Sequence, residues 1–156
     1  MALNRLEDPK TRAIVIRYRD VSDLQRVEML FQAVVEASPE CVKLVSSGGT
    51  VIHMNPAGLA VIDAASLEEV KGTPVIALIA PEHREAFTRF GEEVFRGESR
   101  TLRFEVTGLK GKRRWLESYA VAVQGPGVPS PVMLAVTRDI TQRKTAEDAL
   151  KEREGL

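Results

Sequence analysis

Cysteine and histidine, the residues that most often carry chemistry, are scarce in this sequence of 156 residues. Cys41 is the only cysteine, and His53 and His83 are the only histidines. A nucleophilic cysteine needs a neighbouring base and a lowered pKa, and a metal site needs several ligands at fixed spacing. Neither pattern occurs, so we expect no catalytic constellation, hence no enzyme, and no metal site. Cys41 is expected to be a small buried side chain, and the histidines to be structural or solvent-facing.

Composition argues against other classes of function. The 22 basic and 22 acidic residues cancel, so no electrostatic argument favours nucleic acid as a partner. The one basic cluster, residues 110–114, is short and falls at an expected hairpin turn. A single cysteine suits a reducing compartment, and no apolar run approaches the ~18 residues of a membrane span. We therefore expect a cytoplasmic location and no membrane insertion by this segment.

The positions of apolar residues predict the strands that must support any site. Two strands, at 41–45 and 50–54, flank a Ser-Ser-Gly-Gly turn, and three more follow at 101–107, 113–123 and 132–140. Hairpin connections predict one five-stranded antiparallel sheet. The short helices predicted within the domain all fall between the second and third strands, which places them on one face and gives an α+β fold.

Capping residues mark where these helices begin. Asn55 caps the first, and Ser66 with Glu69 three positions later has the pattern of a capping box. Pro81 starts a longer helix. A further charged helix is expected from about residue 141 to the end of the sequence.

Another helix is expected before the sheet. Ser22 with Gln25 has the pattern of its capping box, and Pro39 ends it. Apolar residues within it follow at spacings of 3, 4 and 3, as in a heptad repeat: Leu24, Val27, Phe31 and Val34. This stripe fits either a helix that packs on its own domain or a two-chain coiled coil, and two heptads are too few to decide.

One phrase near the start of the chain returns near its end. "RDVSDLQRVE" begins at residue 19 and "RDITQRKTAE" at residue 138, 119 positions later, and each follows a short apolar run. The earlier run, "AIVIRY" (13–18), would expose unpaired backbone groups if it had no sheet. We therefore expect it to pair with another edge or to be disordered, and residues 1–12 to be an aperiodic leader.

Four segments in this order resemble a PAS domain with its C-terminal PAC strands. They are "LFQAVVEASPE", "VIHMNPAGL", "APEHREAF" and "VTRDITQRK", and the likeness covers about residues 29–145. Asn-Pro-Ala after the second strand and Asp-Ile-Thr at the close of the fifth match the family residue for residue. The resemblance implies a PAS fold with a linker helix on each side.

This resemblance also offers an explanation of the repeated phrase. "AIVIRYRDVS" looks like the last strand and exit of a preceding PAS domain, and the offset equals one module plus its linker; chance similarity is the alternative. The implied domains are a leader and last-strand remnant (1–21), a linker helix (22–37), the PAS/PAC core (38–141) and the start of a C-terminal signalling helix (142–156).

The function implied by the resemblance is that of a regulatory sensory module in a signal-transduction protein, such as a histidine kinase of a two-component system or a cyclic-dinucleotide enzyme. A small ligand or a partner would act on the core, and the flanking helices of a homodimer would carry the change to an output domain. The alternative is a dimerisation scaffold without a ligand.

The implied transmitting junction is Asp139, Ile140 and Thr141. Thr141 would cap the outgoing helix through its hydroxyl, Ile140 would anchor the strand end, and Asp139 would accept a hydrogen bond or an ion pair.

An apolar pocket between sheet and helices is the remaining candidate site. The candidate lining residues, which could equally fill the core, are Leu44, Phe87, Phe90, Leu102, Phe104, Tyr119 and Val121. Strand register decides which face Trp115 and Tyr119 occupy, and the sequence does not fix it.

The resemblance also bears on cofactors. Haem-binding members use a histidine deeper in the helix than His83, and light-sensing members of the LOV type need a cysteine in the region that matches residues 55–70, which has none. We therefore expect neither haem nor flavin, and leave an unidentified small ligand open.

Overall fold

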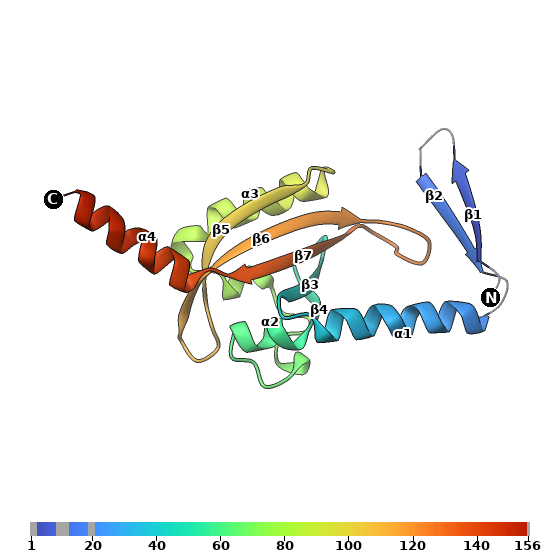
Figure 1. The fold of residues 1–156 in the computed structure, drawn as a ribbon, viewed down its shortest axis with the longest axis horizontal. Coiled ribbons are helices and arrows are strands. Elements are labelled where there is room, and N and C mark those ends of the chain that lie inside the picture. Colours follow the sequence, from blue (N-terminus) through green and yellow to red (C-terminus); the bar gives the residue numbers. More distant parts are fainter. Residues whose placement is uncertain (1–2, 9–12, 19–20, 156) are drawn as a thin grey trace. The chain divides into compact units, whose positions relative to one another are not determined.

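The computed structural model describes residues 3–8, 13–18 and 21–155, with side chains from residue 22 onward (Figure 1). The chain forms two compact units, residues 1–37 and 38–156, and each is described by itself.

The first unit holds a two-stranded sheet and a helix. Strand β1 (Leu3–Asp8) pairs antiparallel with β2 (Ala13–Tyr18), and α1 spans Val21–Ala37. The strand predicted at 13–18 is confirmed, and it pairs with another edge as expected. The prediction of an aperiodic leader is wrong for residues 3–8, because β2 supplies backbone partners that their own sequence does not reveal. Helix α1 begins before Ser22, which therefore lies in its first turn.

The second unit is built on the predicted five-stranded antiparallel sheet. Its strands are β3 (Cys41–Ser46), β4 (Val51–Met54), β5 (Arg100–Thr107), β6 (Arg113–Val123) and β7 (Val132–Asp139). Their spatial order is β4-β3-β7-β6-β5, so the last strand lies in the centre, paired with the first strand of this unit on one side and with β6 on the other.

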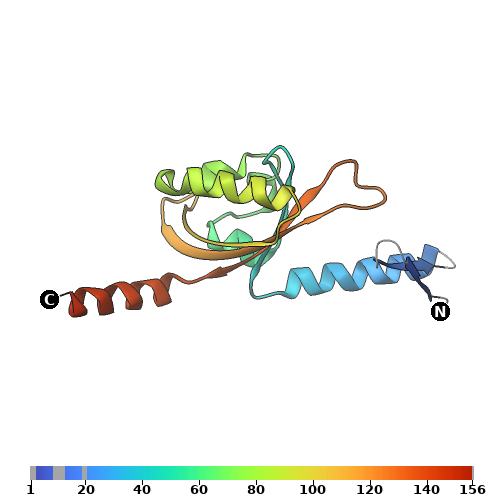
Figure 2. The same cartoon turned by 90° about the horizontal axis from the view of Figure 1, so that it is seen from above.

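Short helices occupy one face of this sheet, which confirms the predicted α+β class. They are α2 (Pro56–Val61), three 3-10 turns (Leu67–Glu69, Val75–Leu78 and Pro81–His83) and α3 (Arg84–Phe95), which lies across the sheet in Figure 2. Helix α4 (Thr141–Glu154) follows β7 and extends away from the sheet (Figures 1 and 2).

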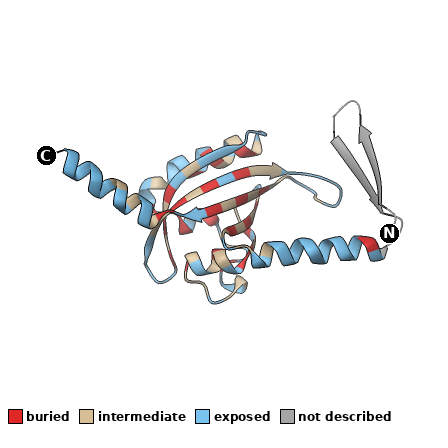
Figure 3. Ribbon diagram, viewed as in Figure 1, coloured by how far each residue is buried: buried red, intermediate tan, exposed pale blue. Residues whose placement is uncertain are grey.

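The core lies between α3 and the sheet. Alternate residues are buried along β3 and in the middle of β6 and β7, and Figure 3 shows such buried stretches of the sheet in red. Phe87, Phe90 and Val94 of α3 belong to the same buried cluster. Buried side chains thus recur at every second residue on the strands and at every third or fourth residue on α3, and the two sets pack against each other.

Asn55 holds the start of α2 against β3, as its predicted capping role requires. Its side-chain oxygen accepts hydrogen bonds from the backbone N–H of Gly58 at 3.1 Å and of Val42 at 2.9 Å, and its amide donates to the Glu40 carbonyl at 2.9 Å. The side chain is completely buried. By contrast, Ser66 makes no side-chain cap bond, so the second predicted capping box is not formed.

Replacing Asn55 by alanine is expected to lower the free energy of unfolding by about 2–3 kcal/mol, because it leaves buried N–H and C=O groups without partners. Urea unfolding measures this loss. The matched control is Ser66→Ala, which should change stability by less than about 0.5 kcal/mol because no cap bond is lost. Equal losses in the two variants would contradict the role assigned to Asn55.

Candidate functional site

An open pocket of about 640 Å³ lies between α3, the turn Val75–Leu78 and the β3–β4 hairpin. Val45 and Met133 contribute to it from the sheet, and Phe87, Gly91 and Phe95 from α3. Its volume is in the range of small-molecule sites, and these five lining residues present mostly apolar surface. The candidate pocket expected from the sequence also lies between sheet and helices, and ligand binding there stays a prediction.

The predicted lining residues separate into two groups. Phe87 lines this pocket, while Phe90 and Phe104 are buried in the adjoining core and Leu102 packs against it. Leu44, Tyr119 and Val121 belong to a second group that does not face the helices.

The prediction that Leu44, Tyr119 and Val121 line the pocket is therefore wrong, and strand register gives the reason. On β3 the buried residues are Cys41, Lys43 and Val45, so Leu44 points to the other face of the sheet. On β6 the buried residues flank Tyr119, whose side chain is 50% exposed, and Val121 follows it on the same face. Trp115, whose face the sequence left open, has the same parity as Tyr119.

A lysine stands among the inward-facing side chains. Lys43 is only 5% exposed and lies in one cross-strand row with Met54 and Ala135. Its ammonium nitrogen is 5.6 Å from the ring centroid of Phe87 and 5.8 Å from that of Phe104. Across residues 22–155, no side-chain hydrogen bond or ion pair involves Lys43. Sequence reasoning missed it, since a lysine between Val42 and Leu44 suggests a solvent-facing position.

Burial dominates the electrostatics around Lys43. Desolvation lowers the pKa of its ammonium below the ordinary value of 10.5. Burial likewise raises the pKa of the Cys41 thiol, although the charge of Lys43 and a hydrogen bond with Thr137 act in the opposite direction. Cys41 is therefore a buried thiol, as predicted, and its raised pKa disfavours the nucleophilic thiolate.

The junction between β7 and α4 is tied to β6. The Thr141 hydroxyl accepts a hydrogen bond from the Trp115 N–H at 3.0 Å and donates to Asp139 Oδ1 at 2.6 Å. Asp139 Oδ1 also accepts from the Thr141 N–H at 2.9 Å, and the Ile140 N–H donates to the Trp115 carbonyl at 2.9 Å. These bonds join the first turn of α4 to a neighbouring strand.

Two of the three expected local contacts at the junction are confirmed. Ile140 is 3% exposed and anchors the strand end, and Asp139 accepts hydrogen bonds. The prediction that the Thr141 hydroxyl caps α4 is wrong, because Asp139 takes the Thr141 N–H and the hydroxyl bonds to β6.

Arg114 links this junction to the end of α2. Its guanidinium donates to the Val61 carbonyl and to both carboxylate oxygens of Asp63, at 3.2 and 3.3 Å, and its Nε lies 4.0 Å from Asp139 Oδ2. The hydrogen bond from Arg114 lowers the pKa of Asp63. Arg114 was not singled out from the sequence, where "KGKRR" suggested only a solvated turn.

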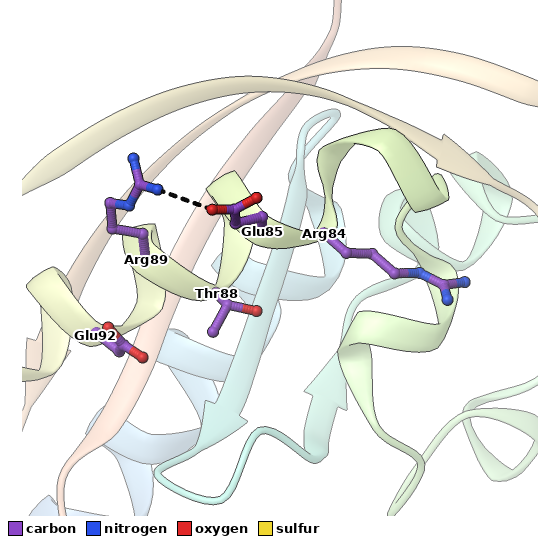
Figure 4. A pocket seen from close by; sticks show the side chains of 5 residues that line it. All are labelled: Arg84, Glu85, Thr88, Arg89 and Glu92. Atoms are coloured by element: carbon purple, nitrogen blue, oxygen red, sulfur yellow. Dashed lines mark hydrogen bonds and ion pairs between the residues drawn. The ribbon is translucent and has the colours of Figure 1, made fainter.

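A second hollow, of about 430 Å³, lies on the outward side of α3 (Figure 4). It is lined by five residues of α3: Arg84, Glu85, Thr88, Arg89 and Glu92. Arg89 donates a hydrogen bond to the Glu85 carboxylate at 3.3 Å. Because one helix supplies all of its lining, the hollow has a single wall and does not enclose a ligand.

The heptad stripe of α1 is solvent-exposed. Its four side chains range from 42% exposed for Val27 to 69% for Val34. Such a stripe of apolar residues can support a helix–helix contact, and its role in a dimer stays a prediction. Of the described helices, none has the length and apolar character that crossing a membrane requires.

The fold and the pocket define a sensory α+β module of the PAS type. A family model described as "PAS fold" matches residues 35–145, so the chain belongs to the PAS family. PAS domains are typically non-catalytic sensory modules of signalling proteins.

Curated relatives include the blue-light-activated histidine kinases of Brucella ovis and Brucella abortus. Each is 30% identical over 80 residues, which cover 51% of this chain and 16% of the relative. The chain thus aligns with about a sixth of these proteins.

Solved structures show the same fold. The PAS domain of an HTR-like protein from Haloarcula marismortui superposes with a TM-score of 0.67 at 20% identity, covering 80% of this chain and 100% of that one. An RNA-binding Light-Oxygen-Voltage receptor gives 0.70 at 14% identity, covering 89% of this chain and 40% of that one.

Replacing Lys43 by methionine is expected to raise the free energy of unfolding at pH 7 by about 1–4 kcal/mol, because an apolar side chain replaces a largely desolvated ammonium that has no acidic partner among the described side chains. Between the lowered folded-state pKa and 10.5, the unfolded chain binds more protons than the folded chain, so wild-type stability rises with pH. The advantage of Lys43→Met should therefore shrink from pH 7 towards 10.5, as measured by urea unfolding.

The control is Lys71→Met, which removes an exposed lysine and should change stability by no more than about 0.5 kcal/mol. A Lys43→Met advantage that stays constant with pH would refute the assigned environment.

Proposed function

We propose that the chain is a sensory PAS module that binds a small ligand in the pocket and passes the change through α4 to an output domain. The observation that carries this proposal is the course of β7. Met133, near one end of this strand, lines the pocket, and Asp139, at its other end, fastens the start of α4. A shift of β7 on ligand binding would therefore act on the outgoing helix.

The contacts at the junction support transmission. Two hydrogen bonds, from Trp115 to Thr141 and from Ile140 to Trp115, hold the start of α4 to β6. Arg114 adds a link to α2, on the helical side of the sheet. A ligand that favours one of two arrangements of this assembly would bias the direction of α4 by its differential affinity.

For the output we propose a signalling domain such as a histidine kinase, since the Brucella relatives that match half of this chain carry that name. For the ligand we propose neither haem nor a flavin that forms a cysteine adduct. Cys41 is buried in β3, and the region from Asn55 to Val70 has no cysteine. A pure dimerisation scaffold is the second candidate, favoured by the exposed stripe on α1.

Small apolar molecules that enter the pocket are expected to raise the melting temperature of the full chain. A ligand at 100 times its dissociation constant adds about 2.7 kcal/mol of stability. Gly91→Leu should abolish this response by filling the pocket, because the added side chain points into open space and leaves the fold intact. Ala86→Leu, on the exposed face of the same helix, should retain it.

Transmission is tested in the same samples by hydrogen exchange. Binding should slow exchange of the Ile140 and Thr141 amides, which bond to Trp115 and Asp139. A ligand that stabilises the chain and leaves these amides unchanged would argue against transmission through α4. Failure of a broad ligand library, with native mass spectrometry finding no bound molecule, would favour the scaffold.

Homodimerisation through α1 is tested by light scattering. We expect the chain to form dimers that Val27→Glu combined with Phe31→Glu converts to monomers, because two charges then replace apolar residues of the stripe. The charge-matched control is Gln25→Glu with Gln32→Glu, on exposed positions of the same helix outside the stripe. Monomeric wild type at high concentration, or equal effects of the two pairs, would exclude a dimer built on this stripe.

A further inference from the structure

Lys43 is the described residue whose position is hardest to explain by stability alone. It is a cation, 5% exposed among apolar side chains, and no side chain of residues 22–155 forms a hydrogen bond or ion pair with it. Its ammonium nitrogen keeps some contact with solvent, because among the described side chains no fully buried nitrogen or oxygen lacks a hydrogen-bond partner. Buried charges in proteins are normally paired or coordinated. The two phenylalanine rings at 5.6 and 5.8 Å attract a cation but offer it no acceptor atom.

The pocket comes close to this cation, although Lys43 is not itself one of its lining residues. Val45, which lines the pocket, is the next inward-facing residue after Lys43 on β3, and two residues along a strand span roughly 7 Å. On β7, Met133 lines the pocket, and Ala135, which pairs with Lys43, is two residues further along the strand on the same face. Phe87 connects the pocket with Lys43, since it lines the pocket and its ring lies 5.6 Å from the Lys43 ammonium nitrogen.

The cross-strand neighbours of Lys43 include two small side chains. In its cross-strand row the next residues are Ala135 on β7 and Ala120 on β6, both fully buried. On the other side its neighbour is Met54 on β4, and the flexible stem of the lysine allows its ammonium to change direction. An anionic group entering from the pocket would provide the acceptor that the protein itself lacks.

We propose that the pocket recognises a small apolar molecule that carries a carboxylate, and that Lys43 is the residue that pairs with this charge. This inference rests on the proposed function, because it names the ligand class of the same pocket. The apolar lining would hold the body of the ligand, and the buried ammonium would select acids over neutral molecules of the same shape. A charge-assisted hydrogen bond formed away from water is stronger than a neutral one.

The test compares shape-matched probes on the full chain at neutral pH. Hexanoate and phenylacetate are each titrated calorimetrically against their primary amides and against the corresponding amines. We expect each acid to bind at least about tenfold more tightly than its amide, as one charge-assisted bond allows. In Lys43→Met, and in the polar variant Lys43→Gln, this preference should fall to within about twofold.

The matched control is Arg96→Gln, which removes the solvent-exposed cation on the pocket rim. It should leave the preference for acids intact. An independent readout is the carbon NMR signal of the Lys43 side chain, whose titration should move to higher pH when an acid is bound.

The possible results separate the two proposals. If amides or amines bind as tightly as acids, or if the preference survives Lys43→Met or disappears in Arg96→Gln, the acid-binding inference fails and the ligand pocket stands. If no acid binds, the inference also fails. Only the absence of binding by every probe and by the broader library removes both the inference and the proposed function.

Discussion

Pairing of the last strand on both of its edges is the constraint on which the rest of the second unit depends. Hydrogen bonds join β7 to β3 over six residue pairs and to β6 over eight, although β3 lies about ninety residues earlier in the chain. This pairing joins the β3–β4 and β5–β6 hairpins into one sheet, fixes which side chains face α3, and places a pocket residue and the exit to α4 on one strand. The same element thus contributes to the candidate pocket and leads directly into α4.

The core next to this strand contains polar and charged side chains beside the apolar ones. Most of its inward side chains are apolar, and the Ser118 and Thr137 hydroxyls satisfy each other at 2.9 Å. Lys43 alone adds a charge there without a protein partner among the described side chains. Proteins tolerate such locally unfavourable groups mainly where function uses them. The combination of a satisfied polar pair with a cation that has no protein partner among the described side chains is therefore more informative than the pocket volume.

The junction shows how a local sequence pattern can suggest the right residues for a partly different reason. Asp-Ile-Thr suggested a cap, an anchor and an acceptor, and the anchor and the acceptor are confirmed. The Thr141 hydroxyl instead accepts a hydrogen bond from the backbone of Trp115 on β6, 26 positions earlier in the chain. A local sequence pattern shows which side chains can bond to the backbone near the start of a helix. Which of them does so also depends on a strand that is distant in the sequence, here β6.

The sequence by itself determined the elements of the second unit, because the signals for strands and for the Asn55 cap are local. It also determined the family, through motif order. Tertiary structure alone decided the strand order and the face that each residue occupies. On β3, Val42 and Leu44 are apolar and Lys43 is charged, yet Lys43 faces the core. A shift of one residue exchanges the two faces of a strand, and pairing with the distant β7 sets that register, so hydrophobicity alone favours the wrong face.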